Sequence, residues 1–333
     1  MPRARPLRIV IPGGTGQVGK ILARHFHEQG DLVTVIARHP VQAEWPVLTW
    51  DGEEPGPWTS AMEGADVVIN LAGRSVNCRY NAANRREIKN SRIFTTHLVG
   101  QAIAIAKTAP RVWLNASTAT IYRHALDRAM DETTGEIGGH EPGAPAKWGF
   151  SIDVATSWER AFFAAETPRT RKLALRSAMV MSPDQGGIFD RLLRLVRWGL
   201  GGASGPGTQY VSWIHDVDFI RTIEFLIARE DFEGVVNVAS PYPETNRDFM
   251  CCLRRAYCTS YVGVPAPTWA LSIGALFMRT ETELILKSRR VIPKRLQDSG
   301  FDLHFPKWRG ACQDLINRWR EMTGEEERPC KSN

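Results

Sequence analysis

The sequence lacks a long hydrophobic run. Its longest apolar stretch, residues 269–278, covers about half of the roughly 20 residues that a membrane-crossing helix needs. The basic start, residues 1–6, leads directly into a short strand-like segment, so it does not have the layout of a secretory signal. We therefore expect a soluble, cytoplasmic protein without a membrane partner.

Cysteines are few, and their spacing is not that of a metal site. None belongs to a Cys-x-x-Cys pair, and no histidine stands at zinc-finger spacing from them. The six positions are Cys78, Cys251, Cys252, Cys258, Cys312 and Cys330. This pattern predicts reduced thiols and no bound metal.

The excess of positive charge is small and spread out. Lysine and arginine number 42 against 36 acidic residues, which gives a formal net charge of +6. Several arginines recur every three residues, as on an ordinary solvated helix face, for example at positions 191, 194 and 197. We therefore expect solubility and attraction of anions rather than a nucleic-acid partner.

The first half of the chain alternates between strand-like and helix-like segments. Continuous apolar strands separated by helices predict a doubly wound parallel α/β sheet, the Rossmann architecture, in which ligands bind beyond the carboxyl ends of the strands. The expected strands are Leu7–Ile11, Leu32–Ala37, Val47–Trp50, Val67–Leu71 and Val112–Asn115, and the expected helices are Gln17–Gln29 and Ala82–Lys107.

The pattern changes after about residue 178. Two further strands, Val211–Ile214 and Val235–Val238, flank a helix over Val217–Arg229, with Asp218 as a candidate N-cap. From Thr245 onward the chain is mostly helical. For a chain of 333 residues we predict two parts. Residues 1–178 with about 211–240 form the Rossmann domain, and 179–210 with 241–333 form a smaller, mainly helical substrate lobe.

A glycine-rich loop joins the first expected strand to the first helix. It reads Gly13, Gly14, Thr15, Gly16, Gln17, Val18 and Gly19. The first glycine of the G-x-x-G-x-x-G spacing permits a tight turn, the second lets backbone approach a pyrophosphate, and the third lets helix and strand pack closely. The helix N-terminus then offers N–H groups to the phosphates. We predict a dinucleotide site; a plain strand–helix turn is the alternative.

The second strand ends in Ala37 and Arg38, without the acidic residue that accepts the ribose hydroxyls of NAD. A guanidinium at this place suits a 2′-phosphate, so we predict NADP(H) as the cofactor. A solvated arginine at a strand end is the alternative.

These and other stretches resemble an atypical or extended short-chain dehydrogenase/reductase. More narrowly, the chain is similar to the subgroup called epimerase family proteins, which carry a C-terminal domain of unknown function. The stretches include GGTGQVG at 13–19, TWDG at 49–52, VINLAG at 68–73, SWERA at 157–161 and SWIHDVD at 212–218. The resemblance implies that Leu71, Ala72 and Gly73 pass beside the adenine ribose and the pyrophosphate. It also implies that Glu87 and Arg92 approach the cofactor; exposed helix charges are the alternative.

The usual catalytic pair of this superfamily is missing. A tyrosine and a lysine four residues later share one helix face, and the ammonium favours the phenolate. No tyrosine in the chain has a lysine at that spacing, and the matching segment has Phe150 and Val154 instead.

Hydroxyl groups near the end of the fifth strand are the replacement candidates. Ser117 and Thr118 stand where the superfamily places a substrate-binding hydroxyl, and Tyr122 is the nearest remaining phenol. The alternative for Ser117 and Thr118 is a capped strand end, and the alternative for Tyr122 is an aromatic side chain packed at an interface. Lys147 is a candidate helper for Tyr122, and His215 is either a substrate contact or a structural histidine.

Two functions remain in view from the sequence. The first is an NADP(H)-dependent oxidoreductase or epimerase that acts on a small polar molecule, with Ser117, Thr118 and Tyr122 as its catalytic candidates. The second is a non-catalytic dinucleotide-binding sensor or partner-binding protein, which the missing tyrosine–lysine pair favours. Neither the substrate nor the oligomeric state follows from the residues.

Overall fold

The computed structural model describes residues 5–139, 141, 145, 148–257, 263–265 and 283–326. Its centre is a seven-stranded sheet whose strands are all parallel. In sheet order they are β3 (Val47–Thr49), β2 (Leu32–Ala37), β1 (Arg8–Pro12), β4 (Val67–Asn70), β5 (Val112–Thr118), β6 (Arg171–Ser177) and β10 (Gly234–Val238). The strand order reverses between β1 and β4, which is where such sheets bind ligands.

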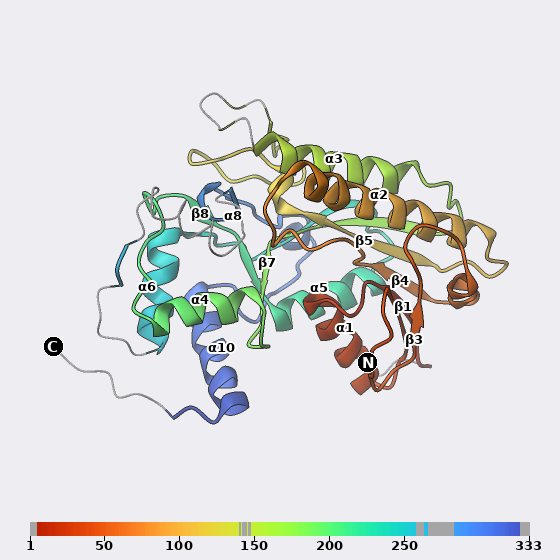
Figure 1. Cartoon of the computed structure of the whole chain (residues 1–333), viewed down its shortest axis with the longest axis horizontal. Coiled ribbons are helices and arrows are strands. Elements are labelled where there is room, and N and C mark those ends of the chain that lie inside the picture. The colour runs from red at the N-terminus through yellow and green to blue at the C-terminus, as the bar shows by residue number, and fades with distance from the viewer. Residues whose placement is uncertain are drawn as a thin grey trace.

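Helices cover both faces of the sheet (Figure 1). On one face lie α1 (Gln17–Glu28) and α5 (Asp216–Ala228), and on the other lie α2 (Ala82–Ile105) and α3 (Gly149–Ala164). Alternate residues of β1 serve the two sides: Ile9 and Ile11 pack toward α1, whereas Val10 packs toward α2. The predicted doubly wound α/β fold is confirmed.

A second core lies at the other end of the molecule (Figure 1). Three helices, α4 (Ile188–Arg197), α6 (Asn246–Tyr257) and α10 (Trp308–Thr323), pack there with the short strands β7 (Met179–Met181) and β9 (Trp213–His215). Trp308 stacks on Phe249 with ring centroids 4.0 Å apart. The C-terminal region is helical as predicted, although Leu296 and its neighbours pack against the main sheet instead.

Shorter elements complete the described chain. They are the 3₁₀ helices η1 (Pro57–Met62) and η2 (Ala119–Ile121), the strands β8 (Tyr210–Val211) and β11 (Glu244–Thr245), and the helices α8 (Glu283–Leu286) and α9 (Lys294–Asp298). β8 pairs with β11 and β9 pairs with β7, so the single strand predicted over 211–214 is wrong. Ser212 lies at the break and donates its hydroxyl to the carbonyl of Arg289 at 2.7 Å.

The start of α5 differs from the prediction as well. His215, not Asp218, is the N-cap, because its ring accepts the N–H of Val217. Asp218 lies inside the first turn, where its carboxylate accepts the N–H groups of His304 and Phe305, each at 2.7 Å. The acid therefore holds the later chain against α5 instead of capping the helix.

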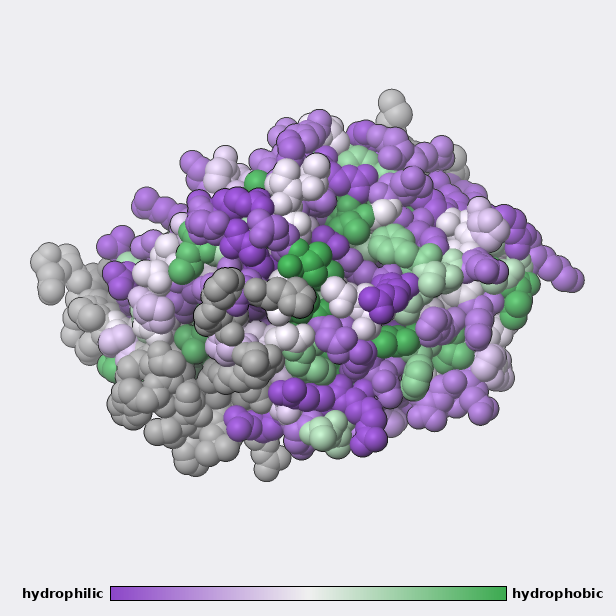
Figure 2. Space-filling view, turned by 90° about the horizontal axis from the view of Figure 1, so that it is seen from above, coloured by the Kyte–Doolittle hydropathy of each residue, from purple (hydrophilic) through white to green (hydrophobic). Residues whose placement is uncertain are grey.

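The surface is mostly hydrophilic. The face on the side of α2 and α3 shows polar residues over most of its area, with hydrophobic groups interspersed (Figure 2). None of the described helices combines the length and apolar composition required to cross a bilayer.

Candidate functional site

The carboxyl ends of β1, β2 and β4 border a cavity of about 590 Å³, which the first half of α2 closes on one side. Many residues predicted to hold the cofactor line this trough: Gly13, Thr15, Gly16, Ala37, Arg38, Leu71, Ala72, Gly73 and Glu87. The others predicted with them lie outside its lining: Gly14, Gln17, Val18, Gly19 and Arg92. The structure thus brings predicted residues as far apart in sequence as Gly13 and Glu87 into one site.

The three glycines of the G-x-x-G-x-x-G spacing have different steric surroundings. Gly13 has φ +79°, and a Cβ there would stand 2.6 Å from the backbone nitrogen of Ala72. A Cβ at Gly19 would stand 2.5 Å from Gly14, so this glycine lets α1 approach the loop. At Gly16, by contrast, the nearest atom would be the Gly13 carbonyl oxygen at 3.5 Å. Gly16 therefore leaves room for a ligand.

The start of α1 offers hydrogen-bond donors to this space. Gly16 is the N-cap and supplies no side-chain cap, so the first N–H groups of the helix are without a capping side chain. Unsatisfied donors at a helix N-terminus fit the oxygens of a pyrophosphate. The loop therefore fits a dinucleotide.

Arg38 lies exposed at the end of β2 and lines the trough. Within the described part of the chain no carboxylate forms an ion pair with it. Asp51, on the same cavity, accepts the N–H groups of Glu53 and Glu54 at 2.8 and 3.0 Å, which lower the pKa of its carboxyl. The acid caps its own turn, and the guanidinium of Arg38 stays available to an anion.

Arg92 supports the trough from behind. Its Nη1 donates to the carbonyls of Ile88 at 2.8 Å and Arg74 at 3.0 Å, and its guanidinium lies 5.1 Å from the ring centroid of Trp158. A Cβ on Gly73 would meet the Arg92 side chain at 3.1 Å. Burial lowers the pKa of Arg92 to about 10. Arg92 thus packs beneath the loop after β4 and does not line the trough, and its approach to the cofactor stays a prediction.

Several lining residues were missed from the sequence. They are Trp50, Asp51, Gly52, Glu53, Arg74, Ser75, Arg86, Asn90, Phe94 and Thr95. On α2 the lining positions 90 and 91 follow position 87 by three and four residues, and position 94 follows them by four and three, so all four share one helix face. That periodicity, taken together with the TWDG stretch, is the signal that could have found them.

The carboxyl end of β5, the predicted substrate end of the sheet, is more closed than the trough. Ser117 and Thr118 are the last residues of β5. The hydroxyl of Ser117 donates to Glu159 at 2.6 Å, and Glu159 forms a two-pronged ion pair with Arg176 at 2.8 and 2.7 Å. Thr118 is half-buried and accepts the N–H of Thr120 at 3.1 Å, which leaves its own hydroxyl hydrogen free to donate.

Tyr122 belongs to the same buried network. It is 2% exposed, donates to Asn237 at 2.9 Å and accepts from Arg176 at 3.0 Å. Burial raises the pKa of its phenol, although the charge of Arg176 acts in the opposite direction. These contacts argue against Tyr122 as the group that exchanges a proton with a substrate.

The segment that the resemblance predicts to carry a tyrosine and a lysine belongs to α3 and has Phe150 and Val154 instead. The ring of Phe150 packs edge-on against Tyr80 with centroids 5.1 Å apart, and Val154 is buried. Burial, with a further contribution from the charge of Glu283, raises the pKa of Tyr80 to about 12. Lys147, the candidate helper of Tyr122, lies outside the described residues.

Charged groups from the C-terminal region reach the segment after β5. Lys287 is 1% exposed and donates from Nζ to the carbonyl of Thr120 at 2.9 Å, and Arg289 donates from Nε to the Thr120 hydroxyl at 3.0 Å. Glu283 accepts from Ser151, one residue after Phe150, at 2.8 Å. Burial, with a smaller contribution from Arg289, lowers the pKa of Lys287 to about 8. No sequence motif indicated these residues.

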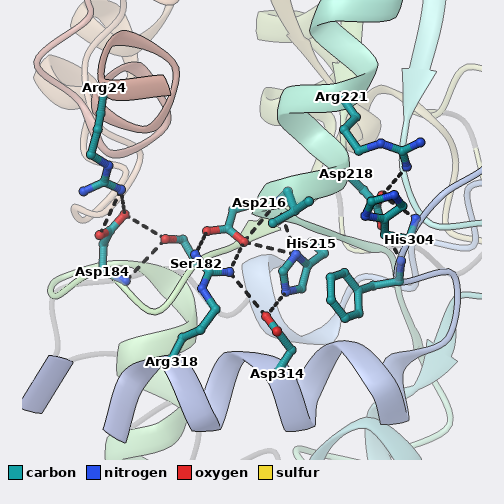
Figure 3. Close-up of polar contacts among 12 residues, drawn as sticks. Arg24, Ser182, Asp184, His215, Asp216, Asp218, Arg221, His304, Asp314 and Arg318 are labelled. Carbon is teal, nitrogen blue, oxygen red and sulfur yellow. Dashed lines mark hydrogen bonds and ion pairs between the residues drawn. The ribbon is translucent and has the colours of Figure 1, made fainter. Parts of the chain in front are cut away.

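His215 is a structural residue (Figure 3). It is fully buried, and its ring stacks on Phe305 with centroids 4.1 Å apart. Nδ1 accepts the N–H of Val217 at 3.2 Å, so Nε2 carries the proton that bonds Asp314 at 2.9 Å. Burial lowers its pKa against the opposing charges of Asp216 and Asp314. Nδ1 caps α5 and Nε2 links α5 to Asp314 on α10, so the ring offers nothing to a substrate.

Comparisons with known proteins agree with this geometry. The model of the NAD dependent epimerase/dehydratase family matches residues 9–239, and that of a domain of unknown function matches residues 266–315. The chain is 30% identical to the epimerase family protein SDR39U1 of Bos taurus over 318 residues, which cover 93% of this chain and 100% of the relative. It is 29% identical to the epimerase family protein SERP0438 of Staphylococcus epidermidis, which covers 93% and 99%.

Solved structures give the same result for the fold. The human epimerase family protein SDR39U1 (isoform2) with NADPH superposes with a TM-score of 0.78 at 27% identity, covering 93% of this chain and 99% of that one. The UDP-N-acetylglucosamine 4-epimerase of Bacillus cereus shares the fold alone, with a TM-score of 0.70 at 13% identity, covering 94% and 99%.

Proposed function

Because this chain belongs to the NAD-dependent epimerase/dehydratase family, we propose that it binds NADP(H) in the trough and acts as an oxidoreductase or epimerase on a small polar substrate. One observation carries the proposal: an open cavity of about 590 Å³ connects the glycine loop to Arg38, which has no carboxylate partner among the described residues. A relative that is 27% identical was solved with NADPH, which supports the choice of cofactor.

The roles of the lining residues follow from their positions. Gly13, Gly16 and the start of α1 suit the pyrophosphate, Leu71 to Gly73 border the adenosine half, and Arg38 suits the 2′-phosphate. Phe94 presents a half-exposed ring to the same cavity and suits the adenine base. When bound, the dinucleotide supplies a carbon that gives or accepts hydride.

The chain itself must hold the substrate oxygen and supply a proton. Thr118 is the hydroxyl best placed for the first task, because Ser117 is engaged by Glu159. Lys287 is a buried ammonium beside the same segment, and its lowered pKa of about 8 allows it to exchange a proton near neutral pH. Ser117 and Tyr122 are then positioning residues, which hold the end of β5 through Glu159 and Arg176.

A non-catalytic sensor or partner-binding protein is the second candidate. The observation that favours it is the replacement of the usual tyrosine and lysine by Phe150 and Val154, which cannot exchange a proton. For either function we infer a cytoplasmic location, because the described cysteines are free thiols and suit a reducing compartment: Cys78, Cys251, Cys252 and Cys312.

The first experiment is a titration of NADPH, NADP⁺, NADH and NAD⁺ against the purified protein and its Arg38→Ala variant. We expect NADPH to bind best and Arg38→Ala to weaken it about ten- to hundred-fold, because one charge-assisted phosphate contact is lost. NADH affinity should not change. Arg229→Ala is the matched control, since the half-buried Arg229 pairs with the exposed Asp231 and does not line the trough. Equal weakening of NADPH and NADH would contradict the role of Arg38.

A second experiment separates the enzyme from the sensor. NADPH oxidation is followed with a panel of aldehydes, ketones and nucleotide sugars, for the wild type and for Thr118→Val. Turnover that Thr118→Val loses while keeping its NADPH affinity supports the enzyme. Tight NADPH binding without turnover across the panel supports the sensor.

A further inference from the structure

Two aromatic contacts fix how α6 lies against α10 in the second core (Figure 1). Near the start of both helices Trp308 stacks on Phe249 at 4.0 Å, and its Nε1 donates to the Phe249 carbonyl at 2.9 Å. Further along, the rings of Tyr257 and Trp319 meet edge-on with centroids 6.2 Å apart. The two helices therefore run side by side in the same direction, and residues that face each other are 59 to 62 positions apart.

This register places two cysteines opposite each other. Cys252 on α6 and Cys312 on α10 are 60 positions apart, and they lie about one helical turn beyond the stacked pair Phe249 and Trp308. Both belong to the packing between the helices: Cys312 is fully buried in the second core, and the half-buried Cys252 packs against it.

The two thiols differ in their tendency to ionise. A hydrogen bond with the Cys312 thiol lowers the pKa of Cys252. The charges of Arg309 and Arg255 lower it further, although burial and the charge of Glu244 act in the opposite direction. Burial raises the pKa of Cys312. Cys252 is therefore the partly exposed thiol that ionises, and Cys312 is its buried, protonated neighbour.

The positions of the two arginines support this electrostatic argument independently. Arg309 stands three residues before Cys312 on α10, and Arg255 stands three residues after Cys252 on α6. Residues at this spacing share a helix face, so each helix brings one exposed guanidinium to the side that carries its cysteine. A partly exposed thiol in a positive environment is the usual setting of a reactive cysteine.

Cys251 provides the contrast within the same helix. It is half-buried like Cys252, but one residue turns about 100° around a helix, and Cys251 does not belong to the packed core. Exposure alone therefore does not distinguish these neighbours. Their positions relative to α10 do.

We propose that Cys252 and Cys312 form a redox-reactive dithiol, which a peroxide oxidises to a disulfide that joins α6 to α10. The half-buried Cys252 meets the oxidant, and the buried Cys312 completes the bond. This inference goes beyond the proposed function, because it does not depend on a dinucleotide in the trough.

The reaction consists of two displacements. The Cys252 thiolate attacks one oxygen of hydrogen peroxide, so that an S–O bond forms, the O–O bond breaks and hydroxide leaves. The Cys312 sulfur then attacks the sulfenic acid at Cys252. The S–S bond forms, the S–O bond breaks, and the thiol proton leaves with the hydroxyl group as water. The two thiols lose two electrons, which the peroxide gains, and a thiol reductant reverses the change by exchange.

The experiment maps the bond in the full chain. Reduced protein, freed of reductant, is treated with a small excess of hydrogen peroxide, alkylated with iodoacetamide and digested with trypsin without reduction. We expect peptide 248–254, which holds Cys251 and Cys252, to be linked to peptide 310–318, which holds Cys312, with the loss of two hydrogens. Cys252→Ser should abolish this link, whereas the matched control Cys251→Ser should keep it.

Trapping the intermediate tests the order of the two steps. In Cys312→Ala the sulfenic acid at Cys252 has no thiol to resolve it, so dimedone should label it about ten-fold more than in the wild type. Cys252→Ser should show no dimedone on either peptide. Oxidised wild type should unfold at a temperature about 5 °C or more above the reduced protein, because the disulfide restricts the unfolded chain, and dithiothreitol should remove the difference.

Four outcomes would overturn the inference: no link in oxidised wild type, a link that persists in Cys252→Ser, a link lost in Cys251→Ser, or a lower unfolding temperature after oxidation. If Cys312→Ala does not fold, the comparison of Cys251→Ser with Cys252→Ser decides, since both change half-buried positions. Absence of NADPH binding by the wild type is a different result, which would overturn the proposed function and leave this inference standing.

Discussion

The two ends of the carboxyl edge of the sheet are built in different ways. The cofactor trough has glycine backbone at Gly13, Gly16 and Gly73 beside the side chains of α2, and it stays open as a cavity of about 590 Å³. The substrate end is held by side chains that bond one another across the core: Ser117, Tyr122, Glu159, Arg176 and Asn237.

The difference shows what each end needs in order to work. A pyrophosphate is bound by N–H groups and by space, which a short local motif supplies. A reacting carbonyl requires positioned hydroxyl and proton-donating groups, which long-range contacts must assemble. The trough therefore depends on a few backbone positions, whereas the substrate end depends on a network that includes Lys287, 167 positions from its partner Thr120.

The largest expected effect comes from breaking the network beneath the substrate end. Glu159→Gln leaves the buried guanidinium of Arg176 without its counter-charge, so we expect the free energy of unfolding to fall by about 3–5 kcal/mol. Urea unfolding measures the loss, with Asp153→Asn, from an exposed pair, as the control that loses no more than about 1 kcal/mol.

The same variant tests whether the two ends are independent. NADPH affinity of Glu159→Gln, measured where the protein is still folded, should stay within about two-fold of the wild type, because Glu159 does not line the trough. A ten-fold loss of affinity would show that the network also shapes the cofactor site, and the contrast between the two ends would not hold.

The next effect sharpens the description of the trough. Gly16→Ala should lower NADPH affinity about ten-fold or more and change stability by less than about 0.5 kcal/mol, since its methyl enters open space with no atom closer than 3.5 Å. Gly19→Ala, by contrast, should lower the free energy of unfolding by about 1–3 kcal/mol, because its methyl would stand 2.5 Å from Gly14. Calorimetric binding and thermal unfolding separate the two; equal behaviour of both variants would contradict the distinct roles.

How far the sequence predicts this molecule depends on the range of the contacts involved. Apolar runs such as residues 32–37 predict buried parallel strands, and β2 has those bounds. The apolar run over 211–214 predicts one strand, yet Ser212 bonds the carbonyl of Arg289, 77 positions away, and two strands form instead. A local sequence pattern contains no information about a partner that is so distant in sequence.

The same limit applies within the site. The glycine spacing predicts a loop in which Gly19 packs against its near neighbour Gly14, whereas the sequence suggests Tyr122 as a free phenol. Its partners Arg176 and Asn237 lie 54 and 115 positions away. Lys287 was missed for this reason too, because only the folded chain brings its ammonium to the end of β5.

A smaller effect concerns the cost of keeping Lys287 at the substrate end. Burial lowers its pKa from 10.5 to about 8, so the unfolded chain binds more protons than the folded one between these values. Stability due to this group is therefore greatest above pH 10.5 and is lost as pH falls through 8.

Lys287→Met removes the penalty. We expect it to be more stable than the wild type at pH 7 by about 1–2 kcal/mol, with an advantage that shrinks as pH rises from 8 toward 10.5. Urea unfolding across pH 6–10 measures the trend. Lys294→Met, from an exposed pair with Asp298, is the control and should keep the wild-type pH dependence over this range. A Lys287→Met protein less stable than the wild type at pH 7 would show that the hydrogen bond to Thr120 outweighs burial.

The smallest effect on stability is expected for Thr118→Val, which tests the chemistry of the substrate end. Thr118→Val keeps the shape of the half-buried side chain and loses a 3.1 Å hydrogen bond from the Thr120 N–H, so stability should fall by no more than about 1 kcal/mol. NADPH affinity should be unchanged because Thr118 does not line the trough. Turnover of any carbonyl that the wild type reduces should fall by about a hundred-fold, because the hydroxyl that holds its oxygen is gone.

Ser117→Ala is the informative comparison: its hydroxyl faces Glu159, so it should lower stability more and turnover less. If the two variants exchanged these effects, Ser117 rather than Thr118 would be the residue that contacts the substrate.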